Sequence, residues 1–99
     1  MEKSYVIKVL KQCLDSIHKS RKHYLFRSSF EQSSYAQWTY EEIIRRIIKS
    51  DDSPLEVIEE FIEELSESIY VNVDNSYIFS VALDTAEDIY RRLFFGTME

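Results

Sequence analysis

The sequence predicts an all-α protein, a single-domain antiparallel bundle of about four helices over residues 1–99. Three observations lead to this prediction. Apolar residues recur at three- and four-residue spacing along most of the chain, which is the repeat of a helix with one buried face. Glycine and proline each occur once, as Gly96 and Pro54, which leaves few residues suited to the tight turns of hairpins. A chain of 99 residues is long enough to bury one core and too short for two.

The first helix is predicted over residues 3–24, because the apolar residues from Val6 to Tyr24 follow helical spacing. Residues 26–38 lose this period and are rich in serine and glutamine. We therefore expect them to form a connection whose aromatic side chains pack back onto the core.

The second helix is predicted over residues 40–49, with Thr39 as its N-cap. The threonine hydroxyl can accept hydrogen bonds from the free amides of the first turn, and Glu42 can reach back to the amide of the cap. Trp38 and Ile43 are placed for the apolar contact that often accompanies such a cap.

The third helix is predicted over residues 54–69. Ser53 can cap it, and Pro54 then occupies the first helical position, where its fixed φ suits the helix and its missing amide hydrogen costs nothing. Because only residues 50–52 separate this helix from the second one, the two should pack antiparallel.

The fourth helix is predicted over residues 76–95, capped by Asn75 or Ser76 and ended by Gly96. Residues 69–73 have the alternating pattern of a strand and are rich in β-branched side chains, and Asp74-Asn75 and residues 77–79 follow them. A short hairpin over residues 69–79, and with it an α+β fold, is therefore the alternative. The predicted core takes apolar positions from all four helices. They are Val6, Leu10, Cys13, Leu14, Ile17, Ile43, Ile47, Ile58, Ile62, Leu65, Ala82, Ala86, Ile89 and Leu93.

The sequence contains no motif for catalysis, for a metal or for a cofactor. We therefore expect a protein that is not an enzyme and that binds neither a metal nor a cofactor. A single glycine cannot build a phosphate-binding loop. His18 and His23 are five positions apart, which turns them about 140° from each other on a helix and prevents them from sharing a metal. Cys13 has no second cysteine to pair with, and no apolar run is long enough to cross a membrane. We therefore expect a cytoplasmic protein.

Charge is distributed unevenly along the chain. Residues 1–30 hold seven basic and two acidic residues, a net charge of +5, whereas residues 31–99 hold five basic and sixteen acidic residues, a net charge of −11. The third helix carries six glutamates on the side away from its apolar residues. They are Glu56, Glu59, Glu60, Glu63, Glu64 and Glu67. A contiguous face of one sign favours a partner of opposite sign, so these six residues are the candidate binding site for a basic protein.

Residues 51–54 (Asp-Asp-Ser-Pro), followed by residues 57–61 (Val-Ile-Glu-Glu-Phe), resemble the third-helix region of colicin-nuclease immunity proteins. Members of that family inhibit nucleases by docking an acidic surface on them. The resemblance thus implies an inhibitor or immunity function with the acidic helix as docking surface. The tyrosine pair that precedes the motif in that family is replaced here by Lys49-Ser50.

Several alternatives remain open at this point. The acidic face can be a solvated surface, partly neutralised by a basic stripe on a neighbouring helix. That stripe consists of Lys8, Lys11, Lys19 and Lys22. Direct nucleic-acid binding through the basic first helix is another alternative, but a pI near 4.9 makes it less favourable, because nucleic-acid-binding domains are typically basic.

Two further alternatives involve apolar residues. Self-association as a homodimer through Tyr77, Val81 or Phe95 is one of them. A small ligand-binding domain or enzyme with an aromatic-lined pocket is the other. The residues expected to line such a pocket are Tyr35, Trp38, Tyr40 and Tyr90.

Overall fold

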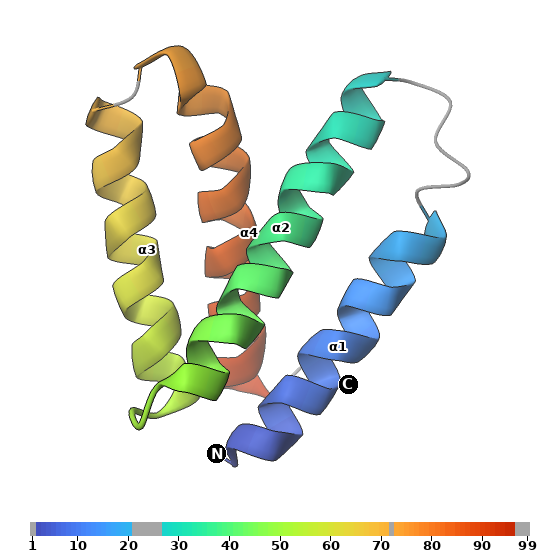
Figure 1. The fold of residues 1–99 in the computed structure, drawn as a ribbon, viewed down its shortest axis with the longest axis vertical. Helices are drawn as coiled ribbons and strands as arrows, with labels where there is room; N and C mark the ends of the chain where they lie inside the picture. The colour runs from blue at the N-terminus through green and yellow to red at the C-terminus, as the bar shows by residue number, and fades with distance from the viewer. Residues whose placement is uncertain (1, 21–26, 72, 97–99) are drawn as a thin grey trace.

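The computed structural model describes residues 2–20, 27–71 and 73–96, and within these ranges it contains four α-helices and one 3₁₀ turn (Figure 1). The predicted all-α fold is confirmed, since no strand is present in these ranges. The elements are α1 (Lys3–Ser20), α2 (Arg27–Lys49), α3 (Pro54–Val71), η2 (Val73–Asn75) and α4 (Ser76–Phe95).

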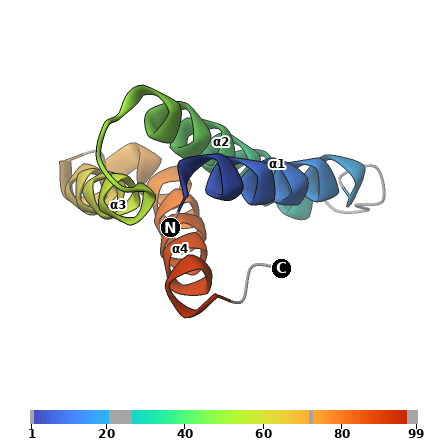
Figure 2. The same ribbon diagram turned by 90° about the horizontal axis from the view of Figure 1, so that it is seen from below.

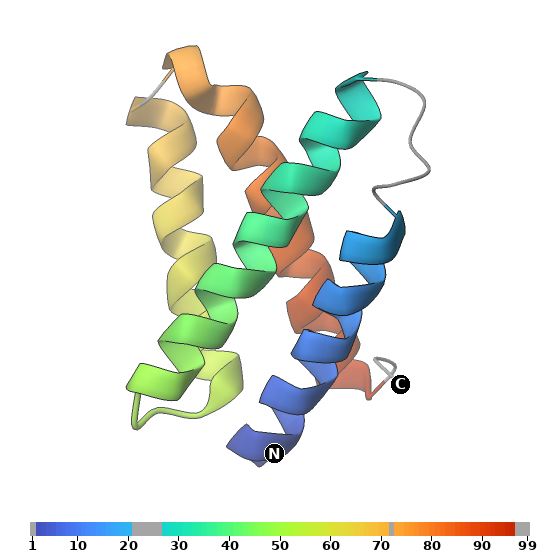
Figure 3. The same cartoon turned by 45° about the vertical axis from the view of Figure 1, so that its right-hand side comes forward.

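Successive helices run antiparallel, and α2 lies between α1 and α3 (Figure 1). Helix α1 packs mainly on α2, whereas α3 packs on α4 and also on α2. The views in Figures 2 and 3 keep α1 and α3 on opposite sides of α2. The two helices with the most strongly opposed charges are therefore separated by the middle of the bundle.

The core contains residues from all four helices, as predicted. Its buried apolar side chains are Val6, Val9 and Leu10 in α1, Tyr40, Ile43, Ile44 and Ile47 in α2, Val57, Ile58, Phe61 and Leu65 in α3, and Val81, Ala82, Ala86, Ile89 and Leu93 in α4. Four residues of the predicted core are only half-buried, namely Cys13, Leu14, Ile17 and Ile62. Three of these belong to α1, whose apolar stripe is incompletely covered because this helix has one main neighbour.

The prediction of a connection up to residue 38 and a helix cap at Thr39 is wrong for residues 27–39. Helix α2 begins at Arg27, so the expected connection is helical from residue 27 onward, while residue 26 lies outside the described residues. Thr39 is not an N-cap but a fully buried residue inside the helix, and its hydroxyl donates to the carbonyl oxygen of Tyr35 at 2.8 Å. A threonine hydroxyl can bond to the carbonyl four residues back as well as cap a helix, so the cap motif alone does not place the helix start.

The other helix limits agree more closely with the predictions. Helix α1 ends at Ser20, and the predicted extension over residues 21–24 lies outside the described residues. Helix α3 begins at Pro54 as predicted, and the amide of Glu56 donates to the hydroxyl of Ser53 at 3.4 Å. Gly96 ends α4 at a φ of 70°, with its amide directed to the carbonyls of the last turn.

The alternative hairpin at residues 69–79 does not form in the described part of this segment. Residues 69–71 complete α3, residues 73–75 form the 3₁₀ turn, and the remaining residues open α4, while residue 72 is not described. Asn75 occupies the N-cap position of α4, but its side chain makes no capping hydrogen bond.

Tyr40 lies where α1, α2 and α4 meet. Only 6% of this residue is exposed, and Cys13 of α1 and Asp88 and Arg92 of α4 are close enough to affect its ionisation. Burial raises the pKa of Tyr40 to about 12, and the neighbouring Cys13 adds to the increase. The folded protein therefore holds this phenolic proton more tightly than the unfolded chain does.

The raised pKa of Tyr40 leads to a prediction about alkaline stability. Its contribution is complete below pH 10, the ordinary pKa of tyrosine, and is lost as the pH rises through about 12. The free energy of unfolding should therefore fall between these values, and should fall less in Tyr40→Phe. Urea titrations at several pH values measure this. In the control Tyr70→Phe, which alters an exposed residue, the free energy of unfolding should fall with pH as much as in the wild type. An equally large fall in Tyr40→Phe would contradict the prediction.

Candidate functional site

The six glutamates predicted as a binding site form one face of α3. The apolar residues Val57, Ile58, Phe61 and Leu65 of this helix are buried against the rest of the bundle, so the positions between them point outward. All six glutamates are exposed. We call this set the acidic face, and it consists of Glu56, Glu59, Glu60, Glu63, Glu64 and Glu67.

One edge of the acidic face is tied to α2 through Arg46. The guanidinium Nη1 of Arg46 lies 2.7 Å from a carboxylate oxygen of Glu64, and its Nε lies 3.0 Å from a carboxylate oxygen of Glu42. The same guanidinium lies over the ring of Phe61, at 4.4 Å from the ring centroid. Hydrogen bonds from Arg45 and Arg46 lower the pKa of Glu42, against the opposing effect of burial. The ion pairs and ring stacking of Arg46 therefore fix the position of α3 relative to α2.

The other edge of the acidic face is tied to α4 through Tyr90. Its hydroxyl donates to a carboxylate oxygen of Glu59 at 2.9 Å. This hydrogen bond to a carboxylate is the main reason that the pKa of Tyr90 is raised. The sequence did not predict either edge, because Arg46 and Tyr90 lie on other helices and nothing in their local pattern indicates a contact with α3.

The middle of the acidic face lacks such partners. In the part of the chain that the structure describes, no ion pair involves Glu56, Glu60, Glu63 or Glu67. The three described lysines of the basic stripe, Lys8, Lys11 and Lys19, do not neutralise them, because α1 lies on the far side of α2 (Figure 1). Within that stripe Lys19 pairs with Asp15 of its own helix, and Lys22 lies outside the described residues.

No protein-family model matches the chain, and no curated protein or solved structure is significantly similar to it. The local resemblance to immunity proteins is therefore carried by residues 51–61 alone. In the structure these residues form the bend before α3 and its first two turns, which include the start of the acidic face.

The aromatic residues predicted to line a pocket do not come together. Tyr40 is buried in the core, Trp38 lies against Phe61 with ring centroids 6.1 Å apart, and Tyr35 meets Tyr77 edge to face. Tyr90, the fourth residue, lies at the edge of the acidic face. These four residues therefore do not form one ligand site.

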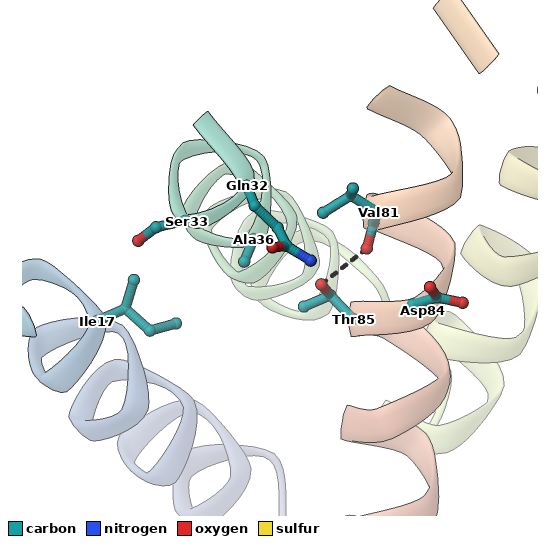
Figure 4. A pocket seen from close by; sticks show the side chains of 7 residues that line it. All are labelled: Ile17, Gln32, Ser33, Ala36, Val81, Asp84 and Thr85. Atoms are coloured by element: carbon teal, nitrogen blue, oxygen red, sulfur yellow. Dashed lines mark hydrogen bonds between the residues drawn. The ribbon is translucent and has the colours of Figure 1, made fainter. Parts of the chain in front are cut away.

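A different cleft, of about 380 Å³, lies between α1, α2 and α4 (Figure 4). Its polar groups do not all converge. The side chain of Gln32 extends toward Thr85, but the hydroxyl of Thr85 donates to the carbonyl oxygen of Val81, and Ser33 and Asp84 are turned to different sides. The Ser33 hydroxyl is buried without a hydrogen-bond partner among the described residues. No nucleophile and base are paired in this cleft. The cleft is lined by residues of three helices, so their spacing in the sequence could not reveal it. These residues are Ile17, Gln32, Ser33, Ala36, Val81, Asp84 and Thr85.

The remaining sequence predictions concern histidine, metal, membrane and self-association. His18 is exposed on α1, and His23 lies outside the described residues. The described residues contain no cluster of side chains suited to a metal ion, and none of their helices is long and apolar enough to cross a membrane. Of the residues proposed for self-association, Tyr77 and Phe95 are exposed, but Val81 is buried and cannot contribute to such a contact.

Proposed function

We propose that this chain is a non-enzymatic interaction protein that binds a basic protein partner through the acidic face of α3, in the manner of an inhibitor, immunity or adaptor protein. The observation that supports this most strongly is the unneutralised middle of the face. Four exposed glutamates there have no ion pair in the described structure, and the basic helix of the same molecule lies on the opposite side. A basic surface could approach them without first displacing an internal partner.

Repulsion within α3 adds to this support. Glu56 and Glu60 are one helical turn apart, as are Glu63 and Glu67, and each such like-charged pair costs an isolated helix about 0.2–0.5 kcal/mol. Basic side chains of a partner would relieve this repulsion. They would also speed association, which would weaken as salt screens the charges.

The acidic face is held rigidly, which favours binding. Its helix is anchored by the buried residues Ile58 and Leu65, and its two edges are fixed by Arg46 and Tyr90. Little backbone freedom would therefore be lost on complex formation, and preorganised surfaces bind more tightly for this reason.

Charge reversal tests the proposal. A variant with Glu56, Glu60, Glu63 and Glu67 each changed to lysine alters four side chains that make no ion pair in the described structure. Four reversals of two charge units each move the net charge from −6 to +2. We expect proteins captured from a lysate by the wild-type chain to be basic, and their affinity for this variant to fall about tenfold or more.

The control variant carries the same change in net charge away from α3. It replaces four exposed acidic residues on other elements by lysine, namely Glu2, Glu41, Asp74 and Asp84. Capture should survive in this control, and circular dichroism should show both variants folded. If the α3 variant captures the same proteins as strongly as the wild type, the acidic face is not the binding surface.

A further inference from the structure

A hollow of about 480 Å³ adjoins the acidic face, in the groove between α3 and α4. It begins beside Tyr90, the residue that bonds to Glu59, and extends to the end of α4. Its lining combines apolar and charged side chains, which are Ile62, Glu87, Tyr90, Arg91, Phe94 and Phe95.

Three rings form a continuous apolar surface along this hollow. Tyr90 and Phe94 are stacked, with ring centroids 6.1 Å apart and an interplanar angle of 16°. Phe94 and Phe95 meet edge to face at 5.2 Å. Despite these contacts, Phe94 is 60% exposed and Phe95 is 68% exposed. We call Tyr90, Phe94 and Phe95 the aromatic platform.

The platform and the acidic face belong to one surface. The hydroxyl of Tyr90 is held by Glu59, so the first ring of the platform is fixed to the edge of the acidic face. Ordered aromatic side chains with large exposed areas are typical anchor points of protein interfaces. A partner that used charge alone would leave these rings in water.

We infer that the partner presents a basic amphipathic helix, whose bulky apolar side chains fill the α3–α4 hollow while its lysines and arginines face Glu59 and Glu63. This inference rests on the proposed function and specifies the chemistry of the partner. A helix places apolar residues at three- and four-residue spacing on one side and can place basic residues beside them. Such a segment matches an apolar groove with an acidic border.

The charges around the hollow favour one orientation of this helix. On α4, Arg91 would repel a basic side chain, whereas Glu87, one turn before it, would attract one, so the charge on this border is mixed. The border on α3 carries the acidic residues Glu59 and Glu63. The basic edge of the partner helix should therefore face α3, with its apolar edge on the platform.

Two synthetic peptides of identical composition test this inference. The first is a leucine and lysine peptide of about 18 residues, or five helical turns, with all leucines on one face. The second has the same residues in an order that spreads the leucines around the helix. Calorimetry should show that the wild-type chain binds the first peptide about tenfold or more tighter than the second, because only the first can present an apolar edge to the hollow.

Changing both phenylalanines to alanine (Phe94→Ala with Phe95→Ala) should abolish the preference for the amphipathic peptide. Binding of the second peptide should not change, because its charges are still met by the acidic face. Ile48→Ala, which removes an exposed apolar side chain from α2, is the matched control and should retain the preference. Because all three side chains are largely exposed, these variants should fold, as circular dichroism can verify.

Failure of this inference can be distinguished from failure of the proposed function. The wild type could bind both peptides equally and lose both when Glu56, Glu60, Glu63 and Glu67 are reversed. This result would overturn the inference of an amphipathic partner helix but would support docking of a basic partner on the acidic face. Unchanged binding of both peptides by the reversal variant would overturn both proposals. A mass in solution that falls from dimer to monomer on changing the two phenylalanines would show that a second copy covers the platform.

Discussion

Replacing Ala36 by proline is expected to lower the free energy of unfolding by about 3 kcal/mol or more. Ala36 lies in the interior of α2, within the segment whose sequence resembles a connection. In a helix its amide donates to the carbonyl of residue 32, and a proline at this position would remove that hydrogen bond and clash with the same carbonyl. Since α2 packs on α1 and α4, and Ala36 lines the cleft between these three helices, bending α2 here would also disturb both contacts. Urea unfolding followed by far-UV circular dichroism measures the effect.

Ala36→Gly is the control for this prediction. Glycine keeps the amide and costs only about 1 kcal/mol in a helix interior, mainly through backbone entropy. In a flexible connection, proline would cost no more than glycine. Equal losses for the two variants would therefore show that residues 27–38 are not helical in solution.

Replacing Ile58 by alanine is expected to lower the free energy of unfolding by about 2–5 kcal/mol. Ile58 is fully buried on the inner side of α3 and belongs to the core shared by all four helices. Removing its outer carbons loses their burial and leaves a cavity that the close-packed neighbours fill only partly. The same unfolding experiment measures this loss, and Ile58→Val should cost less, about 0.5–1.5 kcal/mol.

An isoleucine-to-alanine substitution at an exposed site is the control, because it changes the helix propensity in the same way but removes no buried side chain. Ile48 is 55% exposed on α2, and Ile48→Ala should change the free energy of unfolding by no more than about 0.5 kcal/mol. If Ile58→Ala were as mild as Ile48→Ala, α3 would not be anchored to the core as described. The acidic face would then lack the rigid support on which its proposed role depends.

Most of the fold could be predicted from local patterns. The start of α3 followed from Ser53 and Pro54, and the end of α4 followed from Gly96, because these residues act on the backbone within one turn. The start of α2 could not be found in this way. Thr39 looks like a cap in the sequence, but its hydroxyl is satisfied by the carbonyl of Tyr35 inside a longer helix that packs on the three other helices.

The candidate site was predictable in part. The six glutamates share a helix, so their spacing alone placed them on one face, and the structure places them there. Their surroundings depend on residues from other helices. Arg46 and Tyr90 reach the acidic face from α2 and α4, and the hollow beside it combines Ile62 with the end of α4. No local pattern connects such residues, because they are brought together only by helix packing.

The sequence by itself determined the helical class, most of the core and the chemistry of each helix face, because these depend on residues a few positions apart. Only the tertiary structure decided which charges stay uncompensated. It placed the basic α1 on the far side of α2 from the acidic α3, and it joined Tyr90 and Phe94 to the edge of that acidic helix. The physical reason is that charge compensation and ring contacts depend on distances between helices, and helical periodicity carries no information about which helices become neighbours.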